Sequence, residues 1–224
     1  MKMQSDPVQQ FIDWYKDAKK CKTIEIPESM CLATTDSNGN PDARMMLLKH
    51  VDIKGFVFYT NMNSPKGLAL HNNPNACLVF HWETLKRQIR IRGKIERTNS
   101  RFIEPILNTF LTTIKKIAQF RTSRSDNDCE ADAYFGSRPR GSQLSAWVSE
   151  KQSQEIDSRS YLVDKLKQKE KQYEDQEISR PPYWVGYRLI PDQMEFWIGR
   201  NFRLHDRFLY VRDNDDWKIK ILSP

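Results

Sequence analysis

The sequence has few of the residues that build metal centres or disulfide frameworks. Its four cysteines and four histidines are scattered through 224 residues, and no two cysteines form a Cys-x-x-Cys pair. Zinc sites and disulfide frames need paired or closely spaced ligands, so we expect reduced thiols, no metal and a cytoplasmic protein. The residues in question are Cys21, Cys31, Cys77, Cys129, His50, His71, His81 and His205.

Long apolar runs and glycine-rich nucleotide motifs are also missing. No hydrophobic stretch approaches the roughly 20 residues that cross a membrane, and the N-terminus lacks the apolar segment of a signal peptide. No Gly-x-Gly-x-x-Gly fingerprint follows a strand, which argues against a nicotinamide or FAD site. We therefore expect no membrane partner.

The composition is that of a globular chain with a basic balance. Hydrophobic residues make up 38% and charged residues 29%, and the net charge is +7. This length suits one well-buried domain, here residues 1–224. The positive charge favours an anionic ligand, a phosphate cofactor or nucleic acid, and does not choose among them.

The pattern of short strands and turns predicts an antiparallel barrel or sandwich, because no βαβ rhythm is present. The fold class is thus mainly β with flanking helices. Strands are expected at 30–35, 43–51, 56–60, 76–83, 87–97, 183–190, 194–200, 207–212 and 217–222. An N-terminal helix, with Asp6 as its cap and Pro7 at its first position, is expected at about 6–20.

A helical and loop insertion is expected at about 100–131. Apolar residues recur at helical spacing from Phe102 to Ile117, and a polar stretch that we interpret as a mobile loop follows at 121–132. Because so apolar a stripe is not left in water, we expect it to be buried against its own barrel, a second subunit or another partner; if the chain is a dimer, the subunit boundary is the most economical place. Other helices are expected from Ser64-Pro65 to Asn72 and at 131–136, 142–148 and 154–173.

The segment Arg203-Leu204-His205-Asp206-Arg207 has the residue types of a wall for a flat anionic ligand. Guanidinium groups bind phosphate, imidazole carries a proton near neutral pH, and the nearby Trp197 offers a stacking face. The alternative is a strand end whose arginine and aspartate pair at the surface.

Other polar motifs admit the same two interpretations. In Arg87–Lys94, strand alternation puts Ile89 and Ile91 on one face and Gln88 with the cations on the other. This polar face is either a ligand wall or a solvated surface.

The stretch Asn63–Gly67 supplies a helix N-terminus beside Lys66, which is either a phosphate seat or a simple cap. Arg44 and Lys49 are five residues apart, so one site can hold both only at a bulge or a strand end. The turn Tyr134–Gln143 is a candidate second anion site.

Taken in order and approximate spacing, these motifs resemble the pyridoxine (pyridoxamine) 5′-phosphate oxidase family. The resemblance runs from about Pro7 to the C-terminus. The motifs are Arg44-Met45-Met46-Leu47-Leu48-Lys49, Phe58-Tyr59-Thr60-Asn61, Asn73-Pro74, Arg87-Gln88, Ser137–Gln143, Glu195-Phe196-Trp197, Arg203–Arg207, Trp217-Lys218 and Leu222-Ser223-Pro224.

The resemblance implies an antiparallel FMN-binding split β-barrel that works as a homodimer, with each flavin site shared between two chains. It implies oxidation of pyridoxamine 5′-phosphate or pyridoxine 5′-phosphate to pyridoxal 5′-phosphate, with O₂ reduced to hydrogen peroxide. The chemistry rests on positioning and electrostatics rather than on a protein nucleophile.

The resemblance also assigns roles to residues. FMN would be bound by Arg44, Lys49, Tyr59, Thr60, Lys66, Gln88, Gln152, Ser153, Trp197 and Arg207, with Arg44, Lys66 and Ser153 on its phosphate. Substrate would be bound by Lys49, Tyr134, Arg138, Ser142, Arg203, Leu204 and His205, with Arg203 and His205 as the catalytic pair facing the pyridine ring.

Three features differ from the family's usual pattern, and one of them is that residues 100–131 fill a connection that the family keeps short. Pro65 stands where an arginine usually precedes the phosphate-binding lysine, and Ser149–Ser153 is one residue longer than the usual Ser-x-Gln-Ser. These last two favour an alternative: a weakly active or non-catalytic paralogue that binds FMN or pyridoxal phosphate. Nucleic-acid binding through 87–101 rests on charge alone, because that stretch lacks interleaved aromatic residues for base stacking.

Overall fold

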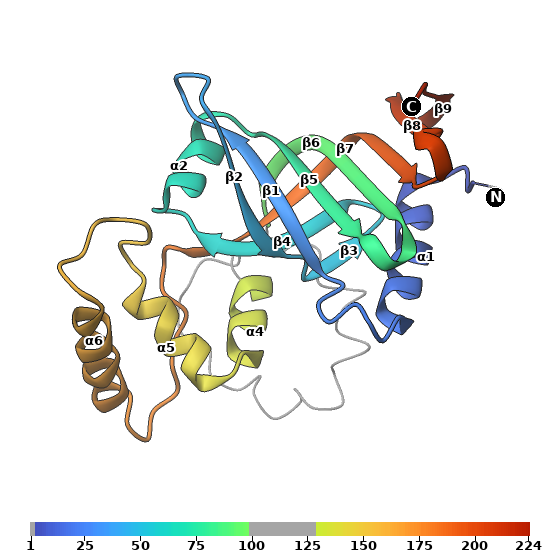
Figure 1. The fold of residues 1–224 in the computed structure, drawn as a ribbon. Helices are drawn as coiled ribbons and strands as arrows, with labels where there is room; N and C mark the ends of the chain where they lie inside the picture. Colours follow the sequence, from blue (N-terminus) through green and yellow to red (C-terminus); the bar gives the residue numbers. More distant parts are fainter. Residues whose placement is uncertain (1–2, 99–128) are drawn as a thin grey trace. The chain divides into compact units, whose positions relative to one another are not determined.

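The computed structural model describes residues 3–98 and 129–224, which form two compact units (Figure 1). The first unit contains the described residues up to Phe58, Lys66–Glu96 and Tyr187–Pro224. The second contains Tyr59–Pro65 and the described residues of Arg97–Gly186. The expectation of one domain over 1–224 stays a prediction, and the expected helix from Phe102 to Ile117 lies outside the described residues.

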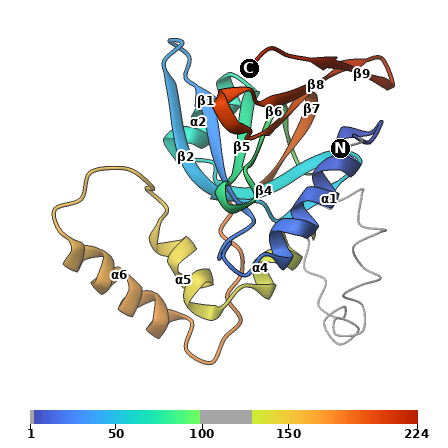
Figure 2. The same cartoon turned by 45° about the vertical axis from the view of Figure 1, so that its right-hand side comes forward.

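Nine strands within the described residues form one curled antiparallel sheet. Its order is β2 (Pro41–Leu47), β1 (Ser29–Thr35), β5 (Asn75–Trp82), β6 (Arg87–Arg97), β7 (Trp184–Ile198), β4 (Gly55–Asn61) and β3 (His50–Asp52). The hairpin of β8 (Asp206–Asp213) and β9 (Asp216–Ile221) continues from β7, as Figure 2 shows. The antiparallel prediction is confirmed.

Strand alternation builds the core of the first unit. Met30 and Leu32 of β1, Leu78 and Phe80 of β5, and Ile89 and Ile91 of β6 are all fully buried. The residues between them on each strand face the other side of the sheet, as the alternation predicts.

Helix α1 (Pro7–Lys20) covers this core with aromatic side chains. The Asp6 carboxylate accepts a hydrogen bond from the backbone N–H of Val8 at 2.8 Å, which caps the helix as the sequence predicts. The Phe11 ring lies 4.8 Å from the Phe56 ring in an edge-to-face contact, and Trp14 makes a similar contact with Phe196 at 5.2 Å. The remaining short elements of this part are α2 (Pro65–Asn72), η1 (Glu83–Leu85) and η4 (Asn201–Arg203).

Strand β7 is continuous, whereas the sequence predicts two strands with a break at 191–193. The Leu189 and Ile190 carbonyls approach two glycines on neighbouring strands. A Cβ atom on Gly55 would lie 2.0 Å from the Leu189 oxygen, and one on Gly93 would lie 1.9 Å from the Ile190 oxygen. Glycine thus lets three backbones pack closely, and the strand runs through Pro191.

The predicted strand 43–51 is instead two strands, β2 and β3. Leu48 and Lys49 separate them, and their backbone N–H groups donate to Glu28 at 2.9 Å and Val57 at 2.8 Å. Leu48 is buried directly after the exposed Leu47, so the chain breaks the strand where a leucine enters the core. Lys49 therefore lies at a strand end.

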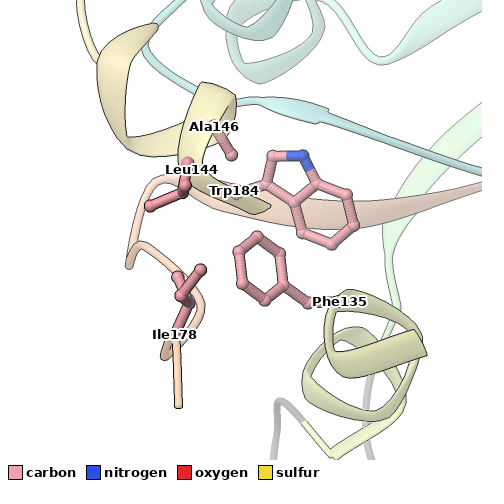
Figure 3. Packing of buried hydrophobic residues seen from close by; sticks show 5 residues of the cluster. All are labelled: Phe135, Leu144, Ala146, Ile178 and Trp184. Carbon is pink, nitrogen blue, oxygen red and sulfur yellow. The ribbon is translucent and has the colours of Figure 1, made fainter. Parts of the chain in front are cut away.

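The second unit has its own small core, shown in Figure 3. Helices α4 (Cys129–Ser137), α5 (Arg140–Val148) and α6 (Arg159–Gln172) belong to this unit. Phe135, Leu144, Ala146, Ile178 and Trp184 pack together there.

Two helix boundaries differ from the prediction. Residues 129–132 are helical rather than part of a loop, and α6 begins at Arg159 rather than Gln154. Among the described helices, none is both long and apolar enough to cross a membrane.

We predict that Gly93→Ala lowers the free energy of unfolding by about 1–3 kcal/mol, because the new methyl group must displace the β7 backbone. The measurement is urea denaturation. The matched control is Gly136→Ala, since nothing lies within 4 Å of a Cβ at that position in α4. Alanine is the better helix former by about 0.5–1 kcal/mol, so this control is expected to be neutral or stabilising. Equal stability of Gly93→Ala and wild type would contradict the close approach.

Candidate functional site

A pair of cations in the first unit forms a candidate phosphate seat. Arg44 lies on β2, where its Nη1 donates to the Leu32 carbonyl at 3.1 Å and to Thr34 Oγ1 at 2.8 Å, and its Nη2 pairs with Asp42. Lys66 lies in the first turn of α2. Burial lowers the pKa of Lys66 and the positive charge of Arg44 lowers it further, whereas Asp42 raises it. Two interacting, half-buried cations are suited to an anion.

A second group of side chains lies where β7 pairs with β8. Trp197 is directly opposite Arg207 in the register of the two strands. The His205 ring centre lies 4.6 Å from that of Trp197. Gly199 leaves space for the indole, because a Cβ there would lie 3.1 Å from the Trp197 ring. The structure thus brings together Trp197, His205 and Arg207 as a pair of tilted aromatic rings with a cation beside them.

Glu195 is a buried carboxylate two residues before Trp197 on β7. Its Oε1 accepts a hydrogen bond from Arg207 Nε at 2.8 Å, and its Oε2 lies 2.8 Å from Arg90 Nη2. The hydrogen bond to Glu195 raises the pKa of the Arg207 guanidinium. Gln88 lies two residues from Arg90 on β6 and is half-buried.

The turn before β8 presents exposed side chains. Phe202 and Arg203 adopt left-handed backbone angles, with φ of 56° and 61°, and Leu204 is exposed. The backbone N–H of Arg200 donates to His205 Nδ1 at 3.1 Å, which places the proton of the neutral imidazole on Nε2. Asp206 pairs at 2.7 Å with Arg200, which lies outside the segment 203–207, so the aspartate of this motif forms a surface ion pair.

The second unit holds a separate aromatic and cationic group. The Tyr59 ring stacks on Tyr134 at 4.5 Å and on Trp184 at 4.9 Å. The Arg138 guanidinium lies 4.9 Å from the Trp184 ring centre, and burial lowers its pKa. Its Nη1 atom is buried and has no hydrogen-bond partner among the described residues. Ser142 lies in the first turn of α5, and the N-cap residue of that helix is Pro139.

Arg138 is therefore suited to bind an anion, because its buried Nη1 lacks an acceptor among the described residues. A buried guanidinium nitrogen without an acceptor costs free energy, and a bound phosphate would supply the acceptor. The N-terminal turn of α5 has no side-chain cap hydrogen bond, so its backbone N–H groups add to the same preference.

Asn61 connects β4 to the segment that carries Gln152 and Ser153. Its Nδ2 donates to the carbonyls of Ser149 at 2.7 Å and Glu150 at 2.9 Å. Gln152 is half-buried, and the exposed Ser153 has a left-handed φ of 69°. The neighbouring Thr60 is buried.

The residues assigned by resemblance thus fall in both units. The first unit holds Arg44, Lys49, Lys66, Gln88, Trp197, Arg203, Leu204, His205 and Arg207, and the second holds Tyr59, Thr60, Tyr134, Arg138, Ser142, Gln152 and Ser153.

Sequence analysis gave no role to Asp42, Asn61 or Glu195. The signal for Glu195 was a charge within the otherwise apolar run Met194–Ile198, and Asn61 stood at the end of a buried strand.

The curled antiparallel sheet places the chain in the class of split-barrel proteins. The crystal structure of PhzG from Burkholderia lata 383, in complex with tetrahydrophenazine-1-carboxylic acid, matches 99% of this chain and 94% of its own. Its TM-score is 0.80 and its identity 27%. A pyridoxamine 5′-phosphate oxidase-related, FMN-binding protein from Nostoc punctiforme covers both chains fully, with a TM-score of 0.68 and 16% identity.

The sequence comparisons identify the family within this class. The family model "Pyridoxamine 5′-phosphate oxidase" matches residues 18–113, and "Pyridoxine 5′-phosphate oxidase C-terminal dimerisation region" matches 184–224. The pyridoxine/pyridoxamine 5′-phosphate oxidase of Paraburkholderia phytofirmans is 44% identical over 98% of this chain and 89% of its own. That of Trichormus variabilis is 43% identical over 100% and 91%.

The chain belongs to the pyridoxine/pyridoxamine 5′-phosphate oxidase family, whose members use FMN.

We predict that Asn61→Asp lowers the free energy of unfolding by about 2 kcal/mol or more. The carboxylate loses both N–H donors and stands beside two carbonyl oxygens. The control is Asn63→Asp, because the side chain of Asn63 is exposed and its hydrogen bond to Asn61 comes from the backbone. Thermal denaturation measures both. If the two variants lose the same stability, the Asn61 contacts are not the cause.

Proposed function

We propose that this chain oxidises pyridoxamine 5′-phosphate or pyridoxine 5′-phosphate to pyridoxal 5′-phosphate, with FMN as cofactor and O₂ as the final acceptor. The observation that carries the proposal is a pair of candidate cationic seats, one in each unit. FMN and the substrate each carry one phosphate group, so two such seats are needed. Arg44 with Lys66 is one seat, and Arg138 with the α5 N-terminus is the other.

The charges of the described side chains suit FMN and the substrate. Arg44, Lys66 and Ser153 would hold the flavin phosphate, and Lys49, Tyr134, Arg138 and Ser142 would hold the substrate phosphate. Trp197 offers a ring face for stacking, with Arg207 as the adjacent cation. The rest of the flavin would contact Tyr59, Thr60, Gln88 and Gln152.

FMN, when bound, would supply a two-electron acceptor for oxidation at the substrate's C4′ carbon, and its reoxidation by O₂ would give hydrogen peroxide. The protein's part is to position the substrate ring. Arg203 and Leu204 belong to an exposed turn that can meet a ligand, and the Nε2–H of His205 is a donor for a ring substituent. No side-chain nucleophile is needed.

We further propose that the enzyme is a homodimer in which each flavin site takes residues from both chains. The match of residues 184–224 to a dimerisation region supports this arrangement. The same segment carries Trp197, Arg203, His205 and Arg207, so the proposed dimer contact and the proposed flavin and substrate residues occupy one stretch of chain.

The direct test is to purify the protein, denature it and identify the released flavin by chromatography. We expect FMN in stoichiometric amount, and O₂ consumption with hydrogen peroxide release when pyridoxamine 5′-phosphate is added. Finding FAD, or no flavin after incubation with excess FMN, would contradict the cofactor assignment. Flavin without turnover would favour the alternative of a non-catalytic binding protein.

A second prediction separates substrate residues from flavin residues. Arg203→Ala and His205→Ala are expected to retain FMN while slowing its anaerobic reduction by pyridoxamine 5′-phosphate about tenfold or more, since each removes a positioning contact. Arg207→Ala is the contrasting variant, expected to lose FMN affinity. Stopped-flow bleaching of the flavin band gives the rates. Wild-type rates in both substrate-side variants would refute their assignment.

A further inference from the structure

The carboxylate of Glu195 is shared by two arginines from two different strands. Glu195 lies on β7 with a side chain only 5% exposed, while Arg207 lies on β8 and Arg90 on β6. Oε1 accepts a hydrogen bond from Arg207 Nε at 2.8 Å, whereas Oε2 lies 2.8 Å from Arg90 Nη2 in an ion pair that lacks hydrogen-bond geometry. A buried carboxylate is costly without such partners, so this arrangement constrains the guanidinium groups as strongly as the carboxylate.

Arg207 is also fixed from a second direction. Its Nη1 donates to the Ser223 carbonyl at 2.8 Å, and its own carbonyl accepts a hydrogen bond from the Leu222 backbone at 2.9 Å. Two acceptors at different nitrogens fix both the position and the plane of the guanidinium, because its donors have a rigid fork geometry. Arg90 has a more exposed side chain, 49% against 27% for Arg207.

The charges of the three groups leave one positive charge on the cluster. If the Glu195 carboxylate paired with Arg207 alone, its negative charge would neutralise the charge of that guanidinium. Because Arg90 shares the same carboxylate, the group Arg90, Glu195 and Arg207 carries a net charge of +1 beside the Trp197 ring. The feature of this cluster that suits an electron-rich ligand is the fixed orientation of the Arg207 guanidinium, and not the net charge.

We propose that Glu195 is a positioning residue for cofactor binding, which acts by orienting Arg207 toward the flavin. This inference rests on the proposed function, in which Arg207 contacts FMN. Glu195 itself need not touch the cofactor.

The test is a double-mutant cycle on FMN affinity. Apoprotein of wild type, Glu195→Gln, Arg207→Gln and the double variant is titrated with FMN, and the quenching of flavin fluorescence gives Kd. Glu195→Gln is expected to raise Kd about tenfold, since the charge-assisted hydrogen bond that orients the arginine is replaced by a weaker one to a neutral amide oxygen. In the Arg207→Gln background, the same change is expected to alter Kd by less than about threefold.

Arg90→Gln is the matched control. It removes the other half of the same ion-pair cluster and leaves the bond between Glu195 and Arg207 in place. We expect its Kd to stay within about threefold of wild type. The visible circular dichroism of FMN at saturation gives an independent signature, expected to change in Glu195→Gln and to persist in Arg90→Gln.

Arg207→Lys tests the inference without altering the buried carboxylate. Lysine keeps the charge and loses the fork that meets both Glu195 and Ser223, so we expect weakened binding close to that of Arg207→Gln. Wild-type affinity in Arg207→Lys, or an equal effect of Glu195→Gln with and without Arg207, would overturn the inference. Failure of wild-type apoprotein to bind FMN would instead overturn the proposed function.

Discussion

The close approach of β7 to its neighbours is the constraint on which the described sheet depends. The Leu189 and Ile190 carbonyls lie where a side chain on Gly55 or Gly93 would have to be, so β4, β7 and β6 can pack only with glycine at these points. The same strand supplies Trp184 to the aromatic group of the second unit, and Glu195 and Trp197 to the first. Two candidate binding groups therefore depend on a single continuous strand.

Local periodicity predicted the elements that have one buried face. The 87–97 strand and the capped helix from Pro7 follow from alternation and from Asp6, because each pattern is complete within one element. The continuity of β7 could not be predicted this way. Pro191 and the polar residues after it indicate a break, and the glycines that accommodate the strand are about 100 residues or more away in the sequence.

In the candidate site too, the sequence indicated the types of side chain but did not show which distant residues they contact. Arginine, lysine and serine at strand and helix ends indicated phosphate binding, and the resemblance named the positions. The contacts that orient these side chains could not be predicted from the sequence. Asn61 reaches Ser149 across 88 residues, and Glu195 reaches Arg90 across more than 100. A buried carboxylate or amide in a strand shows that a partner exists, and only tertiary structure shows which one.

The cations of the proposed cofactor and substrate seats differ in how they are balanced. Arg44 has Asp42 as a partner and Arg207 has Glu195, so each is oriented by a carboxylate. Arg138 rests on the Trp184 face, and its buried Nη1 has no acceptor in the described part of the chain. An oriented cation binds its ligand at little cost in ordering, whereas an unsatisfied one gains the missing hydrogen bond when an anion arrives. This difference suits a resident cofactor on the paired arginines and an exchanging substrate phosphate on Arg138.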